Sequence, residues 1–131
     1  MSKLLIVDDE PSLREFLGIL FRKSKHEIVL ASNGQEAVSI LKEQEFDAIF
    51  TDLKMPGGIG GLEVLEYAKK VAPSTQVVVM TAFATTDTAI KAMKLGAYDY
   101  IQKPFQIDEI QVILTKCLEK RALLQENVQL K

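Results

Sequence analysis

Short apolar runs in this chain end at polar residues whose types suit phosphoryl chemistry. If the runs are neighbouring parallel strands, these side chains emerge together at one edge of one sheet. Like charges packed together raise each other's pKa, so the cluster is costly to assemble without a ligand. A divalent cation and a phosphoryl group would remove that conflict. The residues concerned are Asp8, Asp9, Asp52, Thr81 and Lys103.

The composition is that of an ordinary globular domain. The 131 residues are 47% hydrophobic and 26% charged with a net charge of −2, which fits one domain and does not favour nucleic-acid binding by the folded part. The apolar runs are far below the roughly 18 residues of a membrane span, and no signal peptide is visible. We therefore expect a cytoplasmic protein without membrane contact. Cys117 has no disulfide partner in the chain, and His26 is expected in an exposed loop.

Segments with helical periodicity lie between the apolar runs. The second of them, near residues 35–43, starts at Asn33 with Glu36 three positions on, which resembles a capping box. The first, at residues 11–23, has Pro11 near its first turn. Its expected apolar face comprises Leu13, Phe16, Leu17 and Leu20. Further helices are expected near residues 62–71 and 86–95, and from 107 onward with no stop signal before the chain ends.

Strand and helix thus alternate five times, and the strands are short and apolar on both faces. This pattern predicts a parallel sheet covered by helices on both sides. Because crossovers are right-handed, few topologies remain. We predict an α/β, flavodoxin-like, doubly wound (βα)5 fold with strand order 2-1-3-4-5 and an extended C-terminal helix. In that order the first and third strands are adjacent, which places Asp8 and Asp9 beside Asp52.

Four separated motifs resemble the signature set of response-regulator receiver domains, over about residues 3–120. The resemblance implies a phosphoprotein of a two-component system, in which a histidine kinase transfers a phosphoryl group to Asp52 to form an aspartyl phosphate. Such a domain is not an enzyme with a diffusible product, because it catalyses only its own phosphorylation and dephosphorylation. The motifs are Asp8-Asp9, Asp52-Leu53-Lys54-Met55-Pro56, Thr81-Ala82 and Lys103-Pro104.

The resemblance also implies a magnesium site. Asp9 and Asp52 would ligate Mg²⁺ directly and Asp8 would act through water. The backbone carbonyl of Lys54 would complete the protein's share of the ligands. Mg²⁺ prefers such oxygen ligands and retains several waters.

The same resemblance assigns the remaining polar residues. Lys103 would pair with a phosphoryl oxygen, and its peptide bond to Pro104 would be cis. Thr81 would donate its hydroxyl to another phosphoryl oxygen, and Tyr100 would swing inward when the Thr81 side chain moves. The face formed by the fourth helix, fifth strand and fifth helix would then repack and control an output.

The loop after Asp52 departs from the family pattern. Receivers commonly continue as Met-Pro-Gly-x-x-Gly-Leu, whereas residues 55–62 here are one residue longer. Four glycines in positions 57–61 predict a mobile loop. The departure leaves the loop geometry and the dephosphorylation rate open.

Other classes of function remain open from the sequence. A Mg²⁺-dependent aspartyl phosphatase also uses a strand-end Asp, but it carries a second Asp two residues later, where this chain has Lys54. A phosphate-independent binding module with a decayed site would not need the complete acidic, hydroxyl and ammonium set.

Residues 98–105 and the charged tail are similar to regulators of the NtrC type. Those proteins place a receiver before an ATPase domain that activates sigma-54 transcription and before a DNA-binding domain. We expect a receiver domain at residues 1–120 and a helical linker at 121–131 towards an output domain that regulates transcription. A stand-alone receiver is the alternative.

The last helix carries a heptad-like stripe that predicts self-association. Its first half must also pack on the sheet, so only the part after about Cys117 is free for a partner. In that part of the helix, Arg121 and Lys131 weaken the stripe, so the alternative is a frayed terminal helix or linker. We expect a weak homodimer through this helix or through the face named above. The stripe consists of Ile107, Ile110, Leu114, Cys117, Arg121, Leu124, Val128 and Lys131.

Overall fold

The computed structural model describes residues 2–55, 57–82 and 87–130, without the side chains of residues 126–130. Within these ranges, strands and helices alternate along the chain as the sequence predicts. The elements are β1 (Lys3–Val7), α1 (Pro11–Lys23), β2 (Glu27–Ala31), α2 (Gly34–Glu43), β3 (Ala48–Asp52), α3 (Gly61–Val71), β4 (Gln76–Thr81), α4 (Asp87–Lys94), β5 (Asp99–Gln102) and α5 (Ile107–Leu130).

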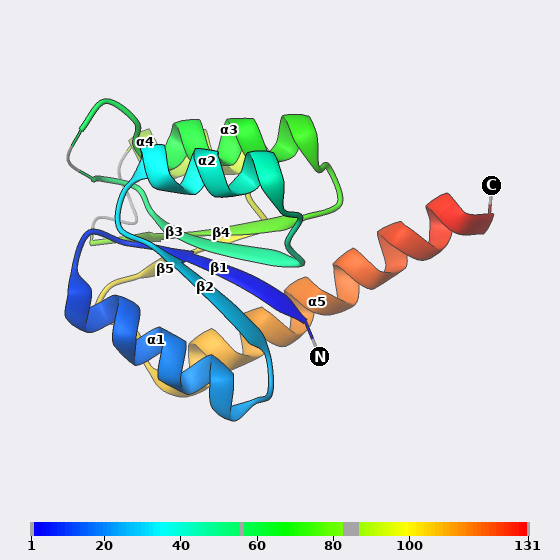
Figure 1. Ribbon diagram of the computed structural model, residues 1–131, viewed down its shortest axis with the longest axis horizontal. Coiled ribbons are helices and arrows are strands. Elements are labelled where there is room, and N and C mark those ends of the chain that lie inside the picture. Colours follow the sequence, from blue (N-terminus) through cyan, green and yellow to red (C-terminus); the bar gives the residue numbers. More distant parts are fainter. Residues whose placement is uncertain (1, 56, 83–86, 131) are drawn as a thin grey trace.

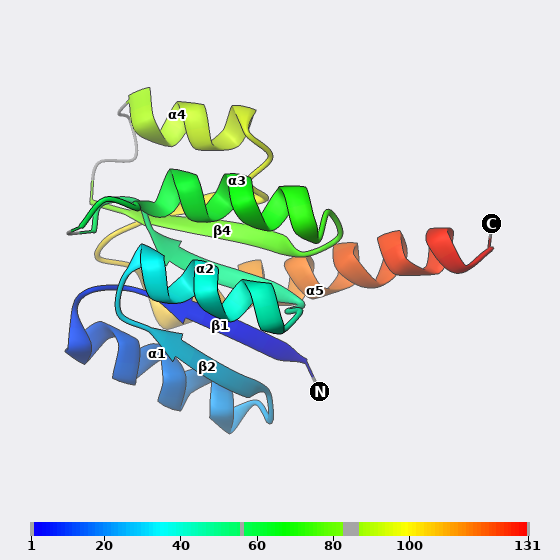
Figure 2. The same ribbon diagram turned by 45° about the horizontal axis from the view of Figure 1, so that its top comes forward.

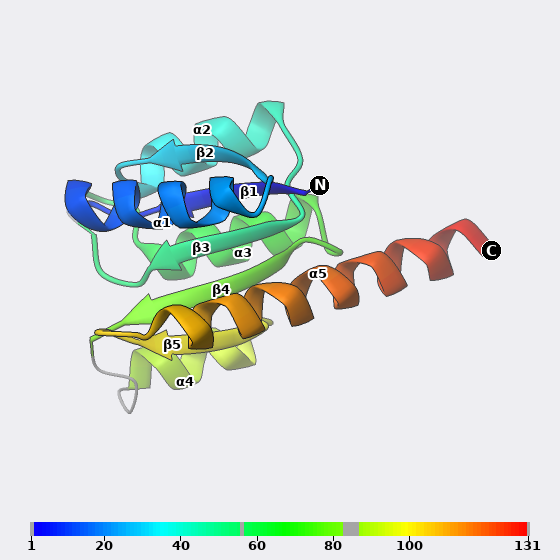
Figure 3. The same ribbon diagram turned by 90° about the horizontal axis from the view of Figure 1, so that it is seen from below.

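The strands form one parallel sheet in the order β2-β1-β3-β4-β5. Helices α2, α3 and α4 lie side by side over one face of this sheet, and α1 and α5 cover the other (Figures 1, 2 and 3). The predicted flavodoxin-like fold and strand order are therefore confirmed. The register pairs Val7 with Thr51 and Asp52 with Met80, so the carboxyl ends of β1, β3 and β4 meet at one edge.

The core consists of two apolar layers, one on each face of the sheet. In β1, Leu5 and Val7 belong to the layer under α2, α3 and α4, whereas Leu4 and Ile6 belong to the layer under α1 and α5. All four side chains are fully buried. This two-sided burial, which the central strands β3 and β4 share, explains why their apolar residues run continuously rather than alternating.

Helix α1 matches its predicted bounds but turns a different aromatic residue inward. Phe16 was expected in the buried stripe, yet it is 41% exposed, and Phe21 is fully buried. The Phe21 ring packs on Phe50 of β3 with ring centroids 5.2 Å apart. The stripe from Leu17 to Phe21 faces the sheet, and Phe16 lies at its edge.

The predicted cap of α2 is present. The Asn33 side chain accepts a hydrogen bond from the backbone N–H of Glu36 at 2.8 Å. The Glu36 carboxylate reaches back to the backbone N–H of Ser32 at 2.6 Å. These two bonds satisfy backbone donors at the helix start.

His26 is not the exposed loop residue that the sequence suggested. It is half-buried, and its Nδ1 accepts a hydrogen bond from the backbone N–H of Ser2 at 3.2 Å. Burial, with the positive N-terminus nearby, lowers the pKa of the imidazole. His26 therefore helps to fix the first residues of the chain at the start of β1.

Helix α5 crosses the sheet and continues well beyond it (Figure 3). Its buried residues are Ile110, Leu114, Cys117 and Arg121, so the middle of the predicted stripe packs within the domain. Ile107 is 46% exposed and does not share this burial. Lys131 and the side chain of Val128 lie outside the described residues. None of the described helices is long and apolar enough to cross a membrane.

Arg121 is held by an ionic contact that spacing alone did not reveal. Its guanidinium donates to Asp47 at 2.6 Å and to Glu45 at 2.9 Å. The second oxygen of Asp47 accepts the backbone N–H of Lys3 at 2.7 Å. Arg121 therefore joins α5 to the α2–β3 connection and to β1, instead of lying in a seam for a partner helix.

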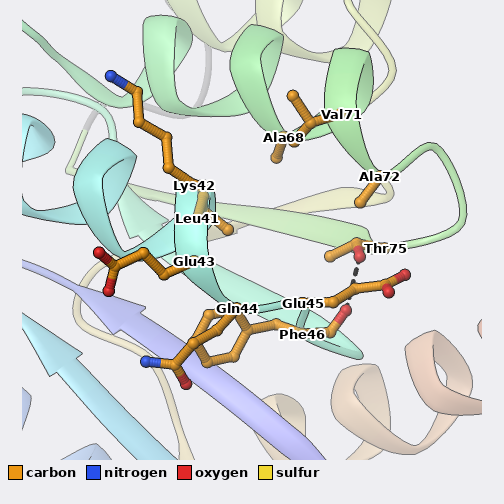
Figure 4. A pocket seen from close by; sticks show the side chains of 10 residues that line it. All are labelled: Leu41, Lys42, Glu43, Gln44, Glu45, Phe46, Ala68, Val71, Ala72 and Thr75. Carbon is orange, nitrogen blue, oxygen red and sulfur yellow. Dashed lines mark hydrogen bonds between the residues drawn. The ribbon is translucent and has the colours of Figure 1, made fainter.

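A pocket of about 300 Å³ lies between the C-terminal ends of α2 and α3 (Figure 4). The Thr75 hydroxyl donates to the Phe46 carbonyl at 2.6 Å beside it, which joins the connections that precede β3 and β4. Both connections lie at the amino ends of their strands. The pocket is therefore remote from the edge where Asp52 emerges.

Arg121→Met should lower the free energy of unfolding by about 1–2 kcal/mol. This is less than the roughly 3–5 kcal/mol expected for breaking a fully buried pair, because the side chains of Asp47 and Glu45 remain 28% and 62% exposed. Urea unfolding measures the effect, with Lys116→Met on the exposed side of the same helix as the control. Equal unfolding midpoints for Arg121→Met and wild type would contradict a stabilising role of the contact.

Candidate functional site

Three carboxylates meet at the carboxyl edge of the sheet. Asp8 and Asp9 follow β1 directly, and Asp52 is the last residue of the neighbouring strand β3. One carboxylate oxygen of each lies within 4.8 Å of the other two. Asp8 is fully buried, Asp52 is partly buried and Asp9 is exposed. The predicted acidic cluster is therefore present, and it opens to solvent at Asp9.

The Lys103 ammonium group bridges two of these carboxylates. It lies 2.9 Å from Oδ2 of Asp8 and 3.2 Å from Oδ2 of Asp52. Its backbone N–H donates to the Thr81 carbonyl at 2.8 Å, which extends the pairing of β4 and β5 to this residue. The peptide bond between Lys103 and Pro104 is cis, as the resemblance implied.

The buried Asp8 is held at each of its polar groups. Its Oδ1 accepts the backbone N–H of Glu10 at 2.9 Å, while Oδ2 faces Lys103. Its N–H donates to the Ala31 carbonyl at 3.1 Å. Its carbonyl accepts a bond from Nη1 of Arg14 at 2.7 Å. Sequence reasoning missed Arg14, because a lone arginine on a helix carries no signal without its contact.

The electrostatics of the site reflect burial and opposite charge. Burial raises the pKa of Asp52, and the Asp8 charge adds to this, whereas Lys103 and a backbone hydrogen bond from Lys54 act in the opposite direction. Burial opposes the charged form of Lys103. Its hydrogen bonds and attraction to Asp8 and Asp52 outweigh that cost and raise the pKa of the ammonium group. The site therefore holds a firmly charged Lys103 and a destabilised Asp52 carboxylate.

Thr81 and Tyr100 lie on the two adjacent strands next to this cluster. Thr81 is the last residue of β4 and is buried, and Tyr100 on β5 is 40% exposed. The register pairs Thr81 with Gln102 and Tyr100 with Val79. The positions agree with the predicted relay, but the roles of both residues stay predictions. Residues 83–86, which follow, lie outside the described part.

The loop after β3 is packed more closely than its glycine content suggested. A side chain at Gly61 would collide with the backbone of Asp52 and Leu53, and one at Gly34 would collide with Ile59. Ile59 itself is half-buried and packs against the core. Packing therefore holds the loop at Ile59. For the exposed Gly57 and Gly58, mobility stays a prediction.

The acidic cluster fits a magnesium ion by the chemistry of its donors. Asp8, Asp9 and Asp52 supply only oxygen atoms, which are the ligands that Mg²⁺ prefers. The solvent-exposed side at Asp9 leaves room for the waters that this ion keeps. The parts expected of Lys54 and of each carboxylate in binding the ion stay predictions.

Asp52→Asn should raise the thermal unfolding midpoint at pH 7 without Mg²⁺. An unfolded Asp ionises near pH 4, and the pKa of Asp52 is raised in the folded state. Stability is therefore lost as pH rises above about 4 and the buried carboxylate ionises. The gain in Asp52→Asn should shrink as pH falls towards about 4, because the buried Asp52 carboxyl of the folded wild type is then largely protonated and no longer carries a charge. Asp108→Asn is the control, and a lower midpoint for Asp52→Asn at pH 7 would contradict the expectation.

The sequence profile of the response regulator receiver domain family matches residues 4–115. The chain is 39% identical over 134 aligned residues to a putative NtrX-like response regulator of Rickettsia conorii, which covers 100% of this chain and 28% of that protein. It is 38% identical over 120 residues to the response regulator PilR of Pseudomonas aeruginosa, covering 92% of this chain and 27% of that protein. The chain thus spans little more than a quarter of the length of these relatives.

Solved structures of receiver domains are also similar to this chain. A receiver domain protein of Clostridium thermocellum superposes with a TM-score of 0.88 at 30% identity, over 95% of this chain and 99% of that one. NtrX of Brucella abortus, solved in complex with ATP, has a TM-score of 0.91 at 29% identity, over 99% of this chain and 30% of that one. The predicted similarity to receivers of NtrC-type regulators is confirmed. This chain belongs to the family of response-regulator receiver domains.

Proposed function

We propose that this domain is a phosphorylation-controlled switch that accepts a phosphoryl group on Asp52 from a histidine kinase. The observation that carries the proposal is the bridge of Lys103 between Asp8 and Asp52, with Asp9 completing the acidic cluster. This set has an attacking carboxylate, a cation for the phosphoryl oxygens and ligands for Mg²⁺. The domain would catalyse only its own phosphorylation and dephosphorylation.

The chemistry at Asp52 is a direct transfer. A carboxylate oxygen of Asp52 forms a bond to phosphorus as the bond from phosphorus to the donor nitrogen breaks. Attack of water on the same phosphorus later returns the free carboxylate. Bound Mg²⁺ would neutralise negative charge that Asp52 and the phosphoryl group bring together. Asp9, Asp52 and the Lys54 carbonyl would hold the ion directly, and Asp8 would hold it through water.

Lys103 changes partners during this transfer. In the structure its ammonium group contacts one oxygen of Asp8 and one of Asp52. Once Asp52 carries a phosphoryl group, the strongest negative charge within reach lies on the phosphoryl oxygens. Lys103 would pair with one of them and Thr81 would donate its hydroxyl to another.

The switch would run from Thr81 to the surface formed by α4, β5 and α5. Movement of the Thr81 hydroxyl towards the phosphoryl group would make room for Tyr100 to turn inward. This surface already exposes apolar side chains that a partner could cover. They are Ile90, Met93, Tyr100, Ile107 and Val112.

The relatives support a proposal about the longer protein to which this domain would belong. We place the chain in the cytoplasm as the receiver part of a longer transcription regulator, with an ATPase domain and a DNA-binding domain beyond residue 131. Residues 121–131 would form the helical linker, with Arg121 fixing its start. The part of α5 beyond Arg121, or the α4–β5–α5 surface, would mediate a weak homodimer.

Asp52→Asn should abolish the Mg²⁺-dependent gain of one phosphoryl mass on incubation with acetyl phosphate, because the amide is not a nucleophile of this kind. Intact mass spectrometry measures the gain. Thr81→Ala keeps the acceptor and should still gain mass, as should the control Asp108→Asn. Undiminished gain in Asp52→Asn would sink the proposal. Repeated turnover of a small phosphate ester by wild type would favour an aspartyl phosphatase instead.

Self-association should depend on the part of α5 beyond Arg121. Leu123 is 61% exposed and Leu124 is half-buried there, while the stripe from Ile110 to Arg121 packs within the domain. Sedimentation should show a weak, concentration-dependent dimer for residues 1–131 that is reduced in a chain ending at Ala122, which keeps the Arg121 contacts. A phosphoryl mimic such as beryllofluoride should change the dimer fraction. Equal monomer fractions under all conditions would leave the tail as a passive linker.

A further inference from the structure

Arg14 reaches back from the second turn of α1 to the turn that carries Asp8 and Asp9. Its Nη1 donates to the Asp8 carbonyl at 2.7 Å, and the side chain is partly buried. The acceptor belongs to the peptide group that joins Asp8 to Asp9. The bond therefore fixes the plane of that peptide, from which the exposed Asp9 side chain follows.

The other bonds at this turn hold Asp8 but do not reach that peptide plane. Ala31 fixes the Asp8 N–H, while Glu10 and Lys103 fix its two carboxylate oxygens. The carbonyl of Asp8 is the remaining strong hydrogen-bonding group of the residue. Arg14 bonds to this carbonyl through a charge-assisted hydrogen bond.

We infer that Arg14 is a positioning residue for the metal site, which holds the Asp8–Asp9 peptide so that Asp9 points at Asp52. The inference rests on the proposed Mg²⁺-dependent function and assigns a new residue to that site. Groups that orient metal ligands through hydrogen bonds, without touching the metal, commonly contribute about 10- to 100-fold to metal affinity. Arg14 acts on the backbone between two carboxylates rather than on a ligand atom, so we expect the lower end of that range.

The charge of Arg14 makes the inference testable by the sign of an effect. A guanidinium beside an acidic cluster repels a divalent cation, so removal of the charge alone would strengthen Mg²⁺ binding. Loss of positioning would weaken Mg²⁺ binding. The two contributions oppose each other, and the direction of the change shows which one dominates.

The experiment is a Mg²⁺ titration of the whole chain followed by backbone amide NMR shifts near Asp9 and Asp52. Arg14→Met removes the donor and the charge but keeps an unbranched side chain that favours a helix. Arg22→Met removes an equal charge near the other end of α1 and serves as the control. Arg14→Lys keeps the charge but presents its donors on a single nitrogen instead of a planar guanidinium. Thermal unfolding checks that each variant is folded at the titration temperature.

Arg14→Met should bind Mg²⁺ about tenfold more weakly than wild type, with Arg14→Lys in between and Arg22→Met unchanged. Its phosphorylation by acetyl phosphate should be slow at limiting Mg²⁺ and recover at saturating Mg²⁺, which a general loss of structure would not produce. Equal or tighter binding by Arg14→Met would overturn the positioning role while the proposed function stands. Wild-type protein without Mg²⁺-dependent shifts would overturn both.

Discussion

The structure depends on one cation that holds two carboxylates at the edge of a parallel sheet. Lys103 is in contact with both Asp8 and Asp52, which come from strands that are neighbours only because β1 lies between β2 and β3. Without that ammonium group, a fully buried Asp8 beside Asp52 would be a strongly unfavourable pair. The fold thus places the charges together, and the ion pairs of Lys103 in turn tie the segment after β5 to the ends of β1 and β3.

This arrangement leaves Asp52 less well satisfied than its neighbours. Asp8 has a partner at each polar group, whereas burial still raises the pKa of Asp52. A carboxylate in that condition gains from any ligand that brings positive charge. The free energy that the folded domain lacks at Asp52 would therefore favour binding of a cation beside this carboxylate. Local instability at a functional site is in this case a direct result of burial.

Much of this could be predicted from the sequence because it depends on short-range pattern. The continuous apolar runs predicted a two-sided sheet, and the polar residues after them predicted the site. Asn33 and Glu36 predicted the cap of α2, which the structure confirms. Such features need only the neighbouring residues and the alternation of strand and helix.

Contacts between distant segments could not be predicted in this way. Helical spacing did not show that Phe21 rather than Phe16 meets Phe50, because the angle of α1 on the sheet decides it. Nor did it show that Arg14 meets the Asp8 carbonyl or that His26 meets Ser2. Arg121 looked like a weak point in a seam, and only the fold brings it to Asp47. Each of these depends on where a whole element lies.

The contact of Arg121 with Asp47 and Glu45 also sets the rotational phase of everything that follows it. A helix turns by about 100° and advances about 1.5 Å per residue. The last contact with the domain therefore fixes the azimuth of each later residue. From Arg121 to the end of α5 at Leu130 the helix advances about 14 Å. Inserting one residue after Arg121 would turn an attached domain by more than a quarter of a circle, whereas inserting seven would nearly restore its direction.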